Sequence, residues 1–255
     1  MRLTILGSGT SVPHATRTSS AIWVETTRGS FLLDCAPSSI HRMAAEGLDW
    51  RNLDAIWVSH FHLDHAGGLA PFLFGTKHAP DTQDRSKPLK ILGPKGLEHW
   101  FAQIDGAGEY RLLEQPFPVE LVEVGPLTEF EVLEGLKAVS FDTPHTVESR
   151  AIRLRESEGG SLVFSSDTGF SKALGSFSKD VDLLILECSF VRDKPTEGHI
   201  ELEEAIYLAR YSRARKTILT HLYPEWDEVD FEKEVKRLTE TNDVVAAFDG
   251  MQIEV

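Results

Sequence analysis

The stretch SHFHLDH (residues 59–65) places three histidines and an aspartate within six residues. It directly follows DAIWV (residues 54–58), an apolar run typical of a buried strand. The histidine loop therefore leaves the carboxyl end of a strand, where α/β folds tend to build their sites. Imidazole and carboxylate groups suit a divalent metal such as zinc. On an extended segment His60 and His62 project to one side and the turn brings Asp64 and His65 to another, so this loop could serve two neighbouring ions.

The composition is that of a globular chain with a sizeable core. At 255 residues and 41% hydrophobic content, residues 1–255 suit a single domain. No run approaches the roughly 18 apolar residues of a membrane span, so we expect no membrane partner. The short apolar N-terminal segment predicts a first strand rather than a signal peptide. Cys35 and Cys188 each end an apolar run, which predicts buried free thiols and a cytoplasmic location.

The charge balance restricts the class of partner. The formal net charge is −14, with 40 acidic against 26 basic residues. A broad nucleic-acid-binding face needs many Lys and Arg contacts, so the charge disfavours a large structured RNA as a partner. Local binding stays open, because bound metal ions would invert the field inside a carboxylate-rich cleft.

Further polar signals occur where predicted strands end. They are His145, Asp167, Glu187 and His221, together with His199 at the start of a predicted helix. Taken singly each has a structural explanation, since a lone histidine after a strand is more often a structural residue and an aspartate before Thr-Gly is usually a turn residue. Together with the histidine loop they supply what two metal ions require: histidines, a bridging carboxylate and open positions.

The order of elements predicts the fold class. Two runs of strands, each interleaved with helices, predict two sheets face to face with helices outside. Residues 117–141 alternate apolar and polar side chains, which predicts successive antiparallel strands. The polar residues 75–89 predict a loop of some length.

These motifs resemble those of the metallo-β-lactamase superfamily, in its ribonuclease Z-like branch. Residues 60–65 match the signature H-x-H-x-D-H, and His145, Asp167 and His221 follow in the family's order. The branch is indicated by LGSGTSVP (residues 6–13) with Arg17 and Ser19, by LECSF (residues 186–190) and by GHIE (residues 198–201). The resemblance spans residues 1 to about 222.

The resemblance implies an αββα sandwich with a dinuclear centre at one edge. The expected metal is zinc, with manganese or iron as alternatives. Carried over by position, His60, His62, His145 and Asp167 hold one ion, and Asp64, His65, Asp167 and His221 hold the other, with Asp167 bridging. Asp34 matches a carboxylate beside the metal loop that orients ligand imidazoles.

The resemblance also implies a reaction. Two cations lower the pKa of a shared water toward neutrality, which supplies hydroxide as the nucleophile. Asp64 either orients this nucleophile or accepts its proton. In ribonuclease Z-like enzymes the helix-opening histidine, paired with a glutamate, stabilises the phosphoryl oxyanion or protonates the leaving oxygen; here these are His199 and Glu187. Thioester and lactam hydrolases do not need this pair, so we expect phosphodiester hydrolysis.

One departure from the branch bears on the substrate. The long tRNA-gripping arm of the family lies between the residues that match His145 and Asp167, which are only 22 positions apart here. We therefore expect the substrate to be a small or flexible phosphodiester, either a small molecule or a short oligonucleotide. Two alternatives stay open: a tRNA 3′-processing endoribonuclease that grips RNA elsewhere, for example through residues 75–89, and a non-hydrolytic iron-binding redox or sensor protein. Homodimers occur in the family, and the sequence identifies no interface.

Overall fold

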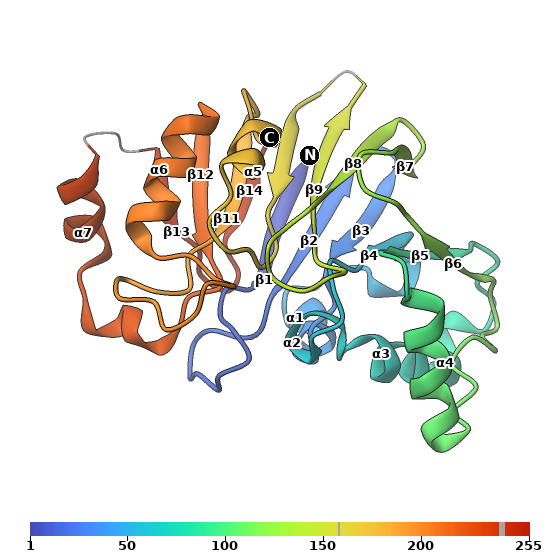
Figure 1. Ribbon diagram of the computed structural model, residues 1–255. Helices are drawn as coiled ribbons and strands as arrows, with labels where there is room; N and C mark the ends of the chain where they lie inside the picture. The colour runs from blue at the N-terminus through green and yellow to red at the C-terminus, as the bar shows by residue number, and fades with distance from the viewer. Residues whose placement is uncertain (158, 240–242) are drawn as a thin grey trace.

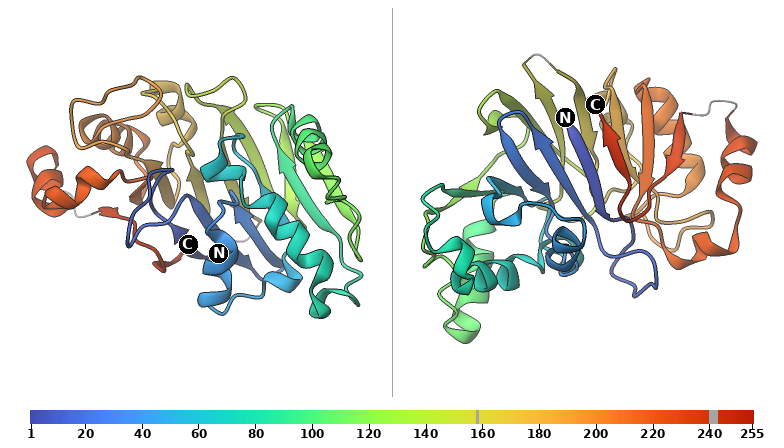
Figure 2. Two further views of the ribbon diagram at one scale, coloured as in Figure 1. Left: turned by 90° about the horizontal axis from the view of Figure 1, so that it is seen from below. Right: turned by 180° about the vertical axis from the view of Figure 1, so that it is seen from behind.

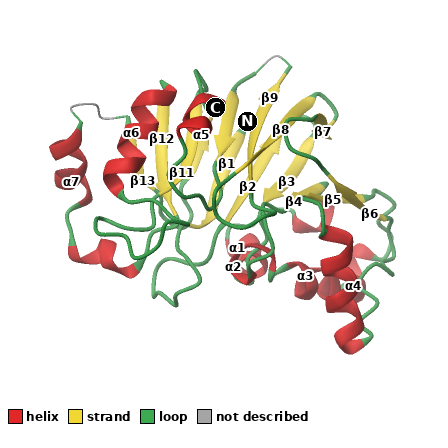
Figure 3. Cartoon of the chain, viewed as in Figure 1, coloured by secondary structure: helices red, strands yellow, loops and turns green. Residues whose placement is uncertain are grey.

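Two seven-stranded sheets pack face to face in the computed structural model, which describes residues 1–157, 159–239 and 243–255. Helices lie outside both sheets, as Figure 1 and the view from below in Figure 2 show. The colouring by secondary structure in Figure 3 shows the strands at the centre of the molecule. The predicted αββα sandwich is confirmed.

The first sheet consists of β1 (Arg2–Gly7), β2 (Ala21–Thr26), β3 (Gly29–Leu33), β4 (Ala55–Trp57), β5 (Leu89–Gly93), β6 (Val119–Glu123) and β14 (Gln252–Glu254). The second consists of β7 (Glu129–Leu133), β8 (Leu136–Asp142), β9 (Arg150–Glu156), β10 (Ser161–Phe164), β11 (Leu183–Glu187), β12 (Lys216–Thr220) and β13 (Val244–Ala246). The α-helices are α1 (Ser39–Ala45), α2 (Leu63–Ala66), α3 (Leu69–His78), α4 (Leu97–Gly108), α5 (Lys172–Phe177), α6 (Leu202–Ser212) and α7 (Phe231–Leu238). Short 3₁₀ turns are η1 (Trp50–Asn52), η2 (Pro80–Thr82) and η3 (Pro224–Glu228).

Both sheets are mixed. The strand order is β14-β1-β2-β3-β4-β5-β6 in the first and β13-β12-β11-β10-β9-β8-β7 in the second. Strands β3 to β6 are parallel neighbours, as are β10 to β13, so several strand ends meet at one edge of each sheet. The chain begins in the first sheet and returns to it with β14, where the amino group of Met1 donates to the carbonyl of Val255 at 2.7 Å.

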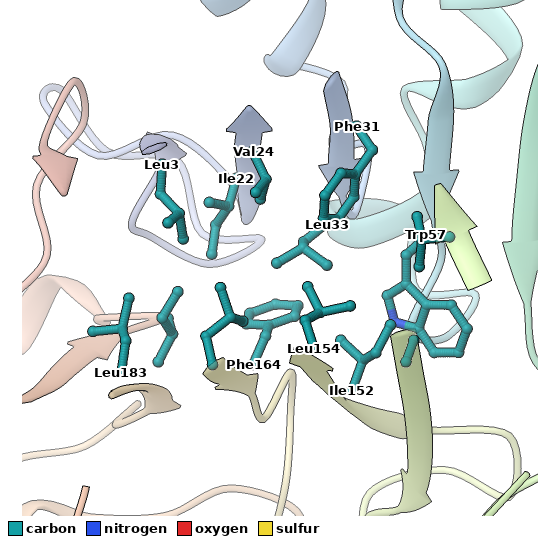
Figure 4. Close-up of a cluster of buried hydrophobic side chains, with 14 of the residues drawn as sticks. Leu3, Ile22, Val24, Phe31, Leu33, Trp57, Ile152, Leu154, Phe164 and Leu183 are labelled. Carbon is teal, nitrogen blue, oxygen red and sulfur yellow. The ribbon is translucent and has the colours of Figure 1, made fainter. Parts of the chain in front are cut away.

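The central core lies between the sheets. Each sheet has one further core between its outer face and the helices that cover it. Side chains alternate along the strands. In β3, Phe31 and Leu33 face the other sheet whereas Leu32 packs with α1, α3 and α4. Figure 4 shows Leu33 of the first sheet directed toward Leu154 and Phe164 of the second. Because the site described below takes residues from both sheets, this central core fixes the distance between its halves.

Three sequence expectations can be compared with the fold. Strand β6 is parallel to β5 in the first sheet, so the prediction of successive antiparallel strands over residues 117–141 is correct for β7 and β8 and wrong for β6. Alternation indicates one covered face and does not specify the strand's partner. Helix α3 continues through His78, so the loop predicted over residues 75–89 is shorter. Cys35 and Cys188 are buried free thiols, as predicted.

Among the described residues, every helix is too short or too polar to cross a bilayer.

The central core predicts a large effect for Leu154→Ala. Leu154 is completely buried between the sheets, so its truncation should lower the free energy of unfolding by about 2–5 kcal/mol. The matched control is Leu113→Ala, because Leu113 is 44% exposed and its change should stay within about 0.5 kcal/mol. Urea denaturation followed by circular dichroism measures both. Equal losses in the two variants would contradict the assigned core.

Candidate metal centre

The polar residues singled out in the sequence converge where strands of both sheets end. The first sheet contributes Asp34 after β3 and residues 59–65 after β4, the last three of which lie in α2. The second contributes His145 after β8, Asp167 after β10, Glu187 at the end of β11 and His221 after β12. His199 lies in the segment between β11 and α6. The structure thus brings together side chains that are up to 187 residues apart in sequence, from Asp34 to His221.

Asp167 lies at the centre of this group and is 2% exposed. Its Oδ1 is 3.1 Å from His65 Nε2 and 3.4 Å from His221 Nε2. Its Oδ2 is 3.5 Å from His145 Nε2 and 3.8 Å from His60 Nε2. Each oxygen therefore faces a different pair of histidines, which divides the cluster into two halves that share one carboxylate.

Outward hydrogen bonds orient the imidazole rings. His65 Nδ1 lies 2.7 Å from Asp34 Oδ2, and His145 Nδ1 lies 2.8 Å from the carbonyl oxygen of Gly198. His60 Nδ1 and His221 Nδ1 each lie 3.0 Å from a serine hydroxyl. Because Nδ1 of all four rings is engaged on the outside, Nε2 is the nitrogen that faces Asp167.

His62 and Asp64 complete the two halves. His62 is exposed, and its Nδ1 lies 3.1 Å from His145 Nε2. Asp64 Oδ2 lies 3.5 Å from His221 Nε2 and 3.9 Å from His65 Nε2. His62 is exposed and Asp64 is partly exposed, so both lie on the side of the cluster that solvent reaches.

The donor set fits divalent metal ions. Four of the buried side-chain atoms that have no hydrogen-bond partner in the described part of the chain belong to this cluster: His60 Nε2, His65 Nε2, His221 Nε2 and Asp167 Oδ1. Buried polar atoms are normally paired, so an inward-facing set without partners is what a metal site requires. Three sets of side chains have ligand atoms within 4.8 Å of one another: His60, His62, His145 and Asp167; Asp64, His65 and His221; and Asp167, His199 and His221.

Electrostatics favours the ligand forms of Asp167, Asp64 and His60. Burial raises the pKa of Asp167, but the charges of His221 and His65 outweigh it and hold the pKa well below its usual range. Burial likewise raises the pKa of Asp64, whereas the hydrogen bond with His221 and the charge of His65 lower it to about 2. Burial lowers the pKa of His60 to about 2, so this ring is neutral. Ionised carboxylates and neutral imidazoles are the forms that bind metals. At His65 burial lowers the pKa, but the charges of Asp167 and Asp34 outweigh it and raise the pKa well above its ordinary value, so this ring must lose a proton when it binds a metal.

Glu187 and His199 form a pair beside the cluster. His199 Nδ1 lies 2.9 Å from Glu187 Oε1, and Glu187 is 1% exposed. The His199 ring is stacked on that of His221 with centroids 5.3 Å apart, and its centroid is 4.8 Å from that of His145. Burial lowers the pKa of His199, but the hydrogen bond and the charge of Glu187 raise it above its ordinary value. A protonated imidazole facing the cluster can donate to a bound anion.

Three turning points of the backbone have a left-handed conformation without glycine. Asp34, Ser166 and His221 have φ values of 61°, 51° and 59°. Such conformations are costly for most residues and concentrate at functional sites. Here they let the chain turn sharply at the ends of β3, β10 and β12 while the side chains stay in the cluster.

Sequence reasoning did not identify Ser59, Ser166 and Ser189 as parts of the site. Ser166 Oγ donates to Ser59 Oγ at 2.6 Å, and both serines are buried. Ser189 Oγ lies between Glu187 and His221. A serine beside a histidine or two positions after a glutamate is too common a pattern to be recognised without the fold.

Known proteins are similar to this chain in sequence and in fold. Ribonuclease Z from Bacillus subtilis (strain 168) is 24% identical over 309 aligned positions, covering 100% of this chain and 99% of the relative. The metallo-β-lactamase fold protein YhfI from Bacillus subtilis has a TM-score of 0.82 at 23% identity, covering 99% and 98% of the two chains. A diphosphatase from the PhnP family has a TM-score of 0.76 at 22% identity, covering 100% and 97%.

The resemblance noted in the sequence is confirmed at the level of the family. A family model described as "Anti-Pycsar protein Apyc1" matches residues 1–245, almost the whole chain. The chain therefore belongs to the Anti-Pycsar protein Apyc1 family, within the ribonuclease Z-like branch of the metallo-β-lactamase superfamily.

Proposed function

We propose that this metal-dependent hydrolase is a phosphodiesterase that acts on a small or flexible phosphodiester. The observation that carries the proposal is the Glu187–His199 pair, which lies against the histidine cluster with the His199 ring stacked on His221. A hydrolase of an uncharged carbonyl substrate does not need a protonated histidine beside its metal ions. A phosphodiester brings a negative charge and a leaving oxygen that needs a proton, and His199 can serve both.

The proposed ligand sets follow the two halves of the cluster. His60, His62, His145 and Asp167 hold one ion, and Asp64, His65, Asp167 and His221 hold the other. Zinc suits this set of imidazole and carboxylate donors, with manganese or iron as alternatives. Bound there, two divalent ions would lower the pKa of a water molecule and polarise the phosphoryl oxygens.

The remaining chemistry belongs to the protein's own side chains. Asp64 lies on the open side of the cluster, where its ionised carboxylate orients the attacking water or accepts its proton. His199, protonated through Glu187, donates a hydrogen bond to a phosphoryl oxygen or a proton to the leaving oxygen. Glu187 holds the ring in place and does not itself reach the substrate.

Charge pairing around the centre supports a small substrate. Three cations on neighbouring segments are already paired: Arg17 with Asp227 at 2.8 Å, Arg150 with Asp142 at 2.6 Å and Lys194 with Glu204 at 2.8 Å. A long RNA is held through many phosphate contacts with Lys and Arg side chains. Cations that already neutralise carboxylates contribute little to such a grip.

Residues 75–89 are a poor substitute for the missing arm. Arg85 is buried and donates to the carbonyl oxygens of Arg51, Leu53, Lys87 and Pro88. Lys87 pairs with Asp54, and Lys77 donates to the carbonyl oxygen of Arg111 at 3.1 Å. These basic side chains therefore fasten residues 75–89 to neighbouring parts of the protein. Between His145 and Asp167, β9 and β10 fill the place where the arm would be inserted.

A second candidate function is tRNA 3′-processing, as the name ribonuclease Z implies for the relative that matches this chain over its full length.

We also propose that residues 1–255 form one domain, because both sheets contribute to a single central core. A cytoplasmic location is proposed from the two free thiols.

Substitution of His199 should separate catalysis from metal binding. With a chromogenic bis-aryl phosphate as substrate, His199→Ala should lower kcat by about a hundredfold or more, because general acid assistance is lost. Metal content should equal that of His41→Ala, an exposed histidine of α1 that serves as the control. If His199→Ala loses one metal ion per chain, His199 is a ligand with Asp167 and His221, and its proposed role is wrong.

A direct comparison of substrates distinguishes the two candidate functions. The protein should hydrolyse a small diester and leave precursor tRNA uncut, because Arg17, Arg150 and Lys194 beside the centre already neutralise carboxylates. Cleavage is followed on denaturing gels across a range of salt concentrations. Efficient cleavage at the tRNA 3′ end, with a steep decline as salt rises, would establish the ribonuclease function instead.

Removal of the metal ions should destabilise the fold as well as abolish hydrolysis. Ions bound only by the folded state add to its stability, so chelation should lower the thermal midpoint by about 5 °C or more. Elemental analysis of the untreated protein should find two ions of zinc, or of a similar divalent metal, per chain. One redox-active iron per chain, with no diester turnover, would favour the sensor alternative.

A further inference from the structure

Two buried hydrogen-bond chains in the centre have the same construction. The first links Asp34, Ser59 and His60, and the second links Glu187, Ser189 and His221. In each chain a buried carboxylate accepts from a serine hydroxyl, and the same hydroxyl faces Nδ1 of a histidine in the cluster. The distances are 2.9 and 3.0 Å in the first chain and 2.8 and 3.0 Å in the second.

The correspondence extends to a second histidine on each carboxylate. Asp34 accepts from His65 Nδ1 at 2.7 Å, and Glu187 accepts from His199 Nδ1 at 2.9 Å. Each carboxylate therefore holds one histidine directly and one through a serine. The first chain arises from strand ends of the first sheet and the second from strand ends of the second sheet.

A serine hydroxyl has one proton, which settles the direction of these bonds. Ser189 donates its proton to Glu187 Oε2, so it can only accept at His221 Nδ1. His221 then carries its proton on Nδ1 and keeps the Nε2 lone pair for the cluster. The same holds for Ser59, which donates to Asp34 Oδ2 and accepts from both His60 and Ser166.

The surroundings leave little freedom for the second chain. Ser189 is fully buried, and Glu187 accepts from the backbone amides of Thr168, Ser189 and Ile200 besides the side chains of Ser189 and His199. These bonds fix both oxygens of Glu187. Ser189 is therefore held in one position, and its hydrogen bond with Nδ1 holds the His221 ring in one orientation.

We propose that Ser189 is a positioning residue that fixes His221 for one metal ion and ties this ligand to the Glu187–His199 pair, as Ser59 fixes His60 for the other ion. The inference rests on the ligand sets proposed above. It assigns to Glu187 a second task, because one carboxylate then supports both the proton donor His199 and, through Ser189, a metal ligand. Loss of such outer contacts lowers metal affinity by about tenfold or more.

Cadmium NMR of the cadmium-loaded protein tests the proposal without using activity. The wild-type protein should show two resonances, one for each ion. Ser189→Ala should shift mainly one resonance and Ser59→Ala mainly the other, and each should weaken cadmium binding in chelator competition by about tenfold or more. Ser178→Ala is the matched control, because Ser178 is buried and donates only to the carbonyl oxygen of Leu174 at 2.9 Å among the described contacts.

A hydroxyl-retaining variant separates hydrogen bonding from packing. Ser189→Thr keeps the hydroxyl and adds a methyl group, so it should bind cadmium more like the wild type than Ser189→Ala does. Wild-type affinity for both ions in Ser189→Ala, or the same resonance shifted by both alanine variants, would overturn the proposal. A wild-type protein with a single resonance would overturn the ligand sets themselves, whatever its activity toward diesters.

Discussion

The ionised carboxylate of Asp167 is almost completely buried, and the Nε2 atoms of four histidines lie 3.1–3.8 Å from its oxygens. A buried charge is tolerated only where opposite charges or hydrogen-bond donors compensate it. Histidines that carry their proton on Nδ1 turn Nε2 lone pairs toward Asp167, so cations held jointly by the carboxylate and the rings of both sheets would supply that compensation. The two halves of the molecule are therefore joined at the carboxylate as well as through their hydrophobic core.

The need to orient those histidines explains much of the polar interior nearby. Asp34 and Glu187 are buried carboxylates, and each holds one histidine directly and a second through a serine. Left-handed turns at Asp34 and His221 allow these residues to stay in the network where the chain reverses. A substitution in this outer layer is consequently expected to act on metal binding without touching the metal ions.

The sequence predicts the local part of the site better than the distant part. Residues 59–65 are contiguous in sequence, so their clustering is visible without a structure. The sites at His145, Asp167 and His221 follow from strand ends and the family's order. Ser189 gives no such signal, because its role depends on a contact with His221, which lies 32 residues further along the chain. Strand β6 was misassigned for a similar reason, since its alternation reports a covered face and not its neighbour. The three-residue strands β13 and β14 are too short to show a period.

The central claim is that Asp167 is shared by two metal ions held between the sheets. Anomalous diffraction at the zinc edge, on crystals of zinc-loaded protein, tests it directly. Two anomalous peaks are expected, one beside His60, His62 and His145 and one beside Asp64, His65 and His221, with one oxygen of Asp167 toward each or one oxygen between them. A single peak, or a second peak away from Asp167, would contradict the claim.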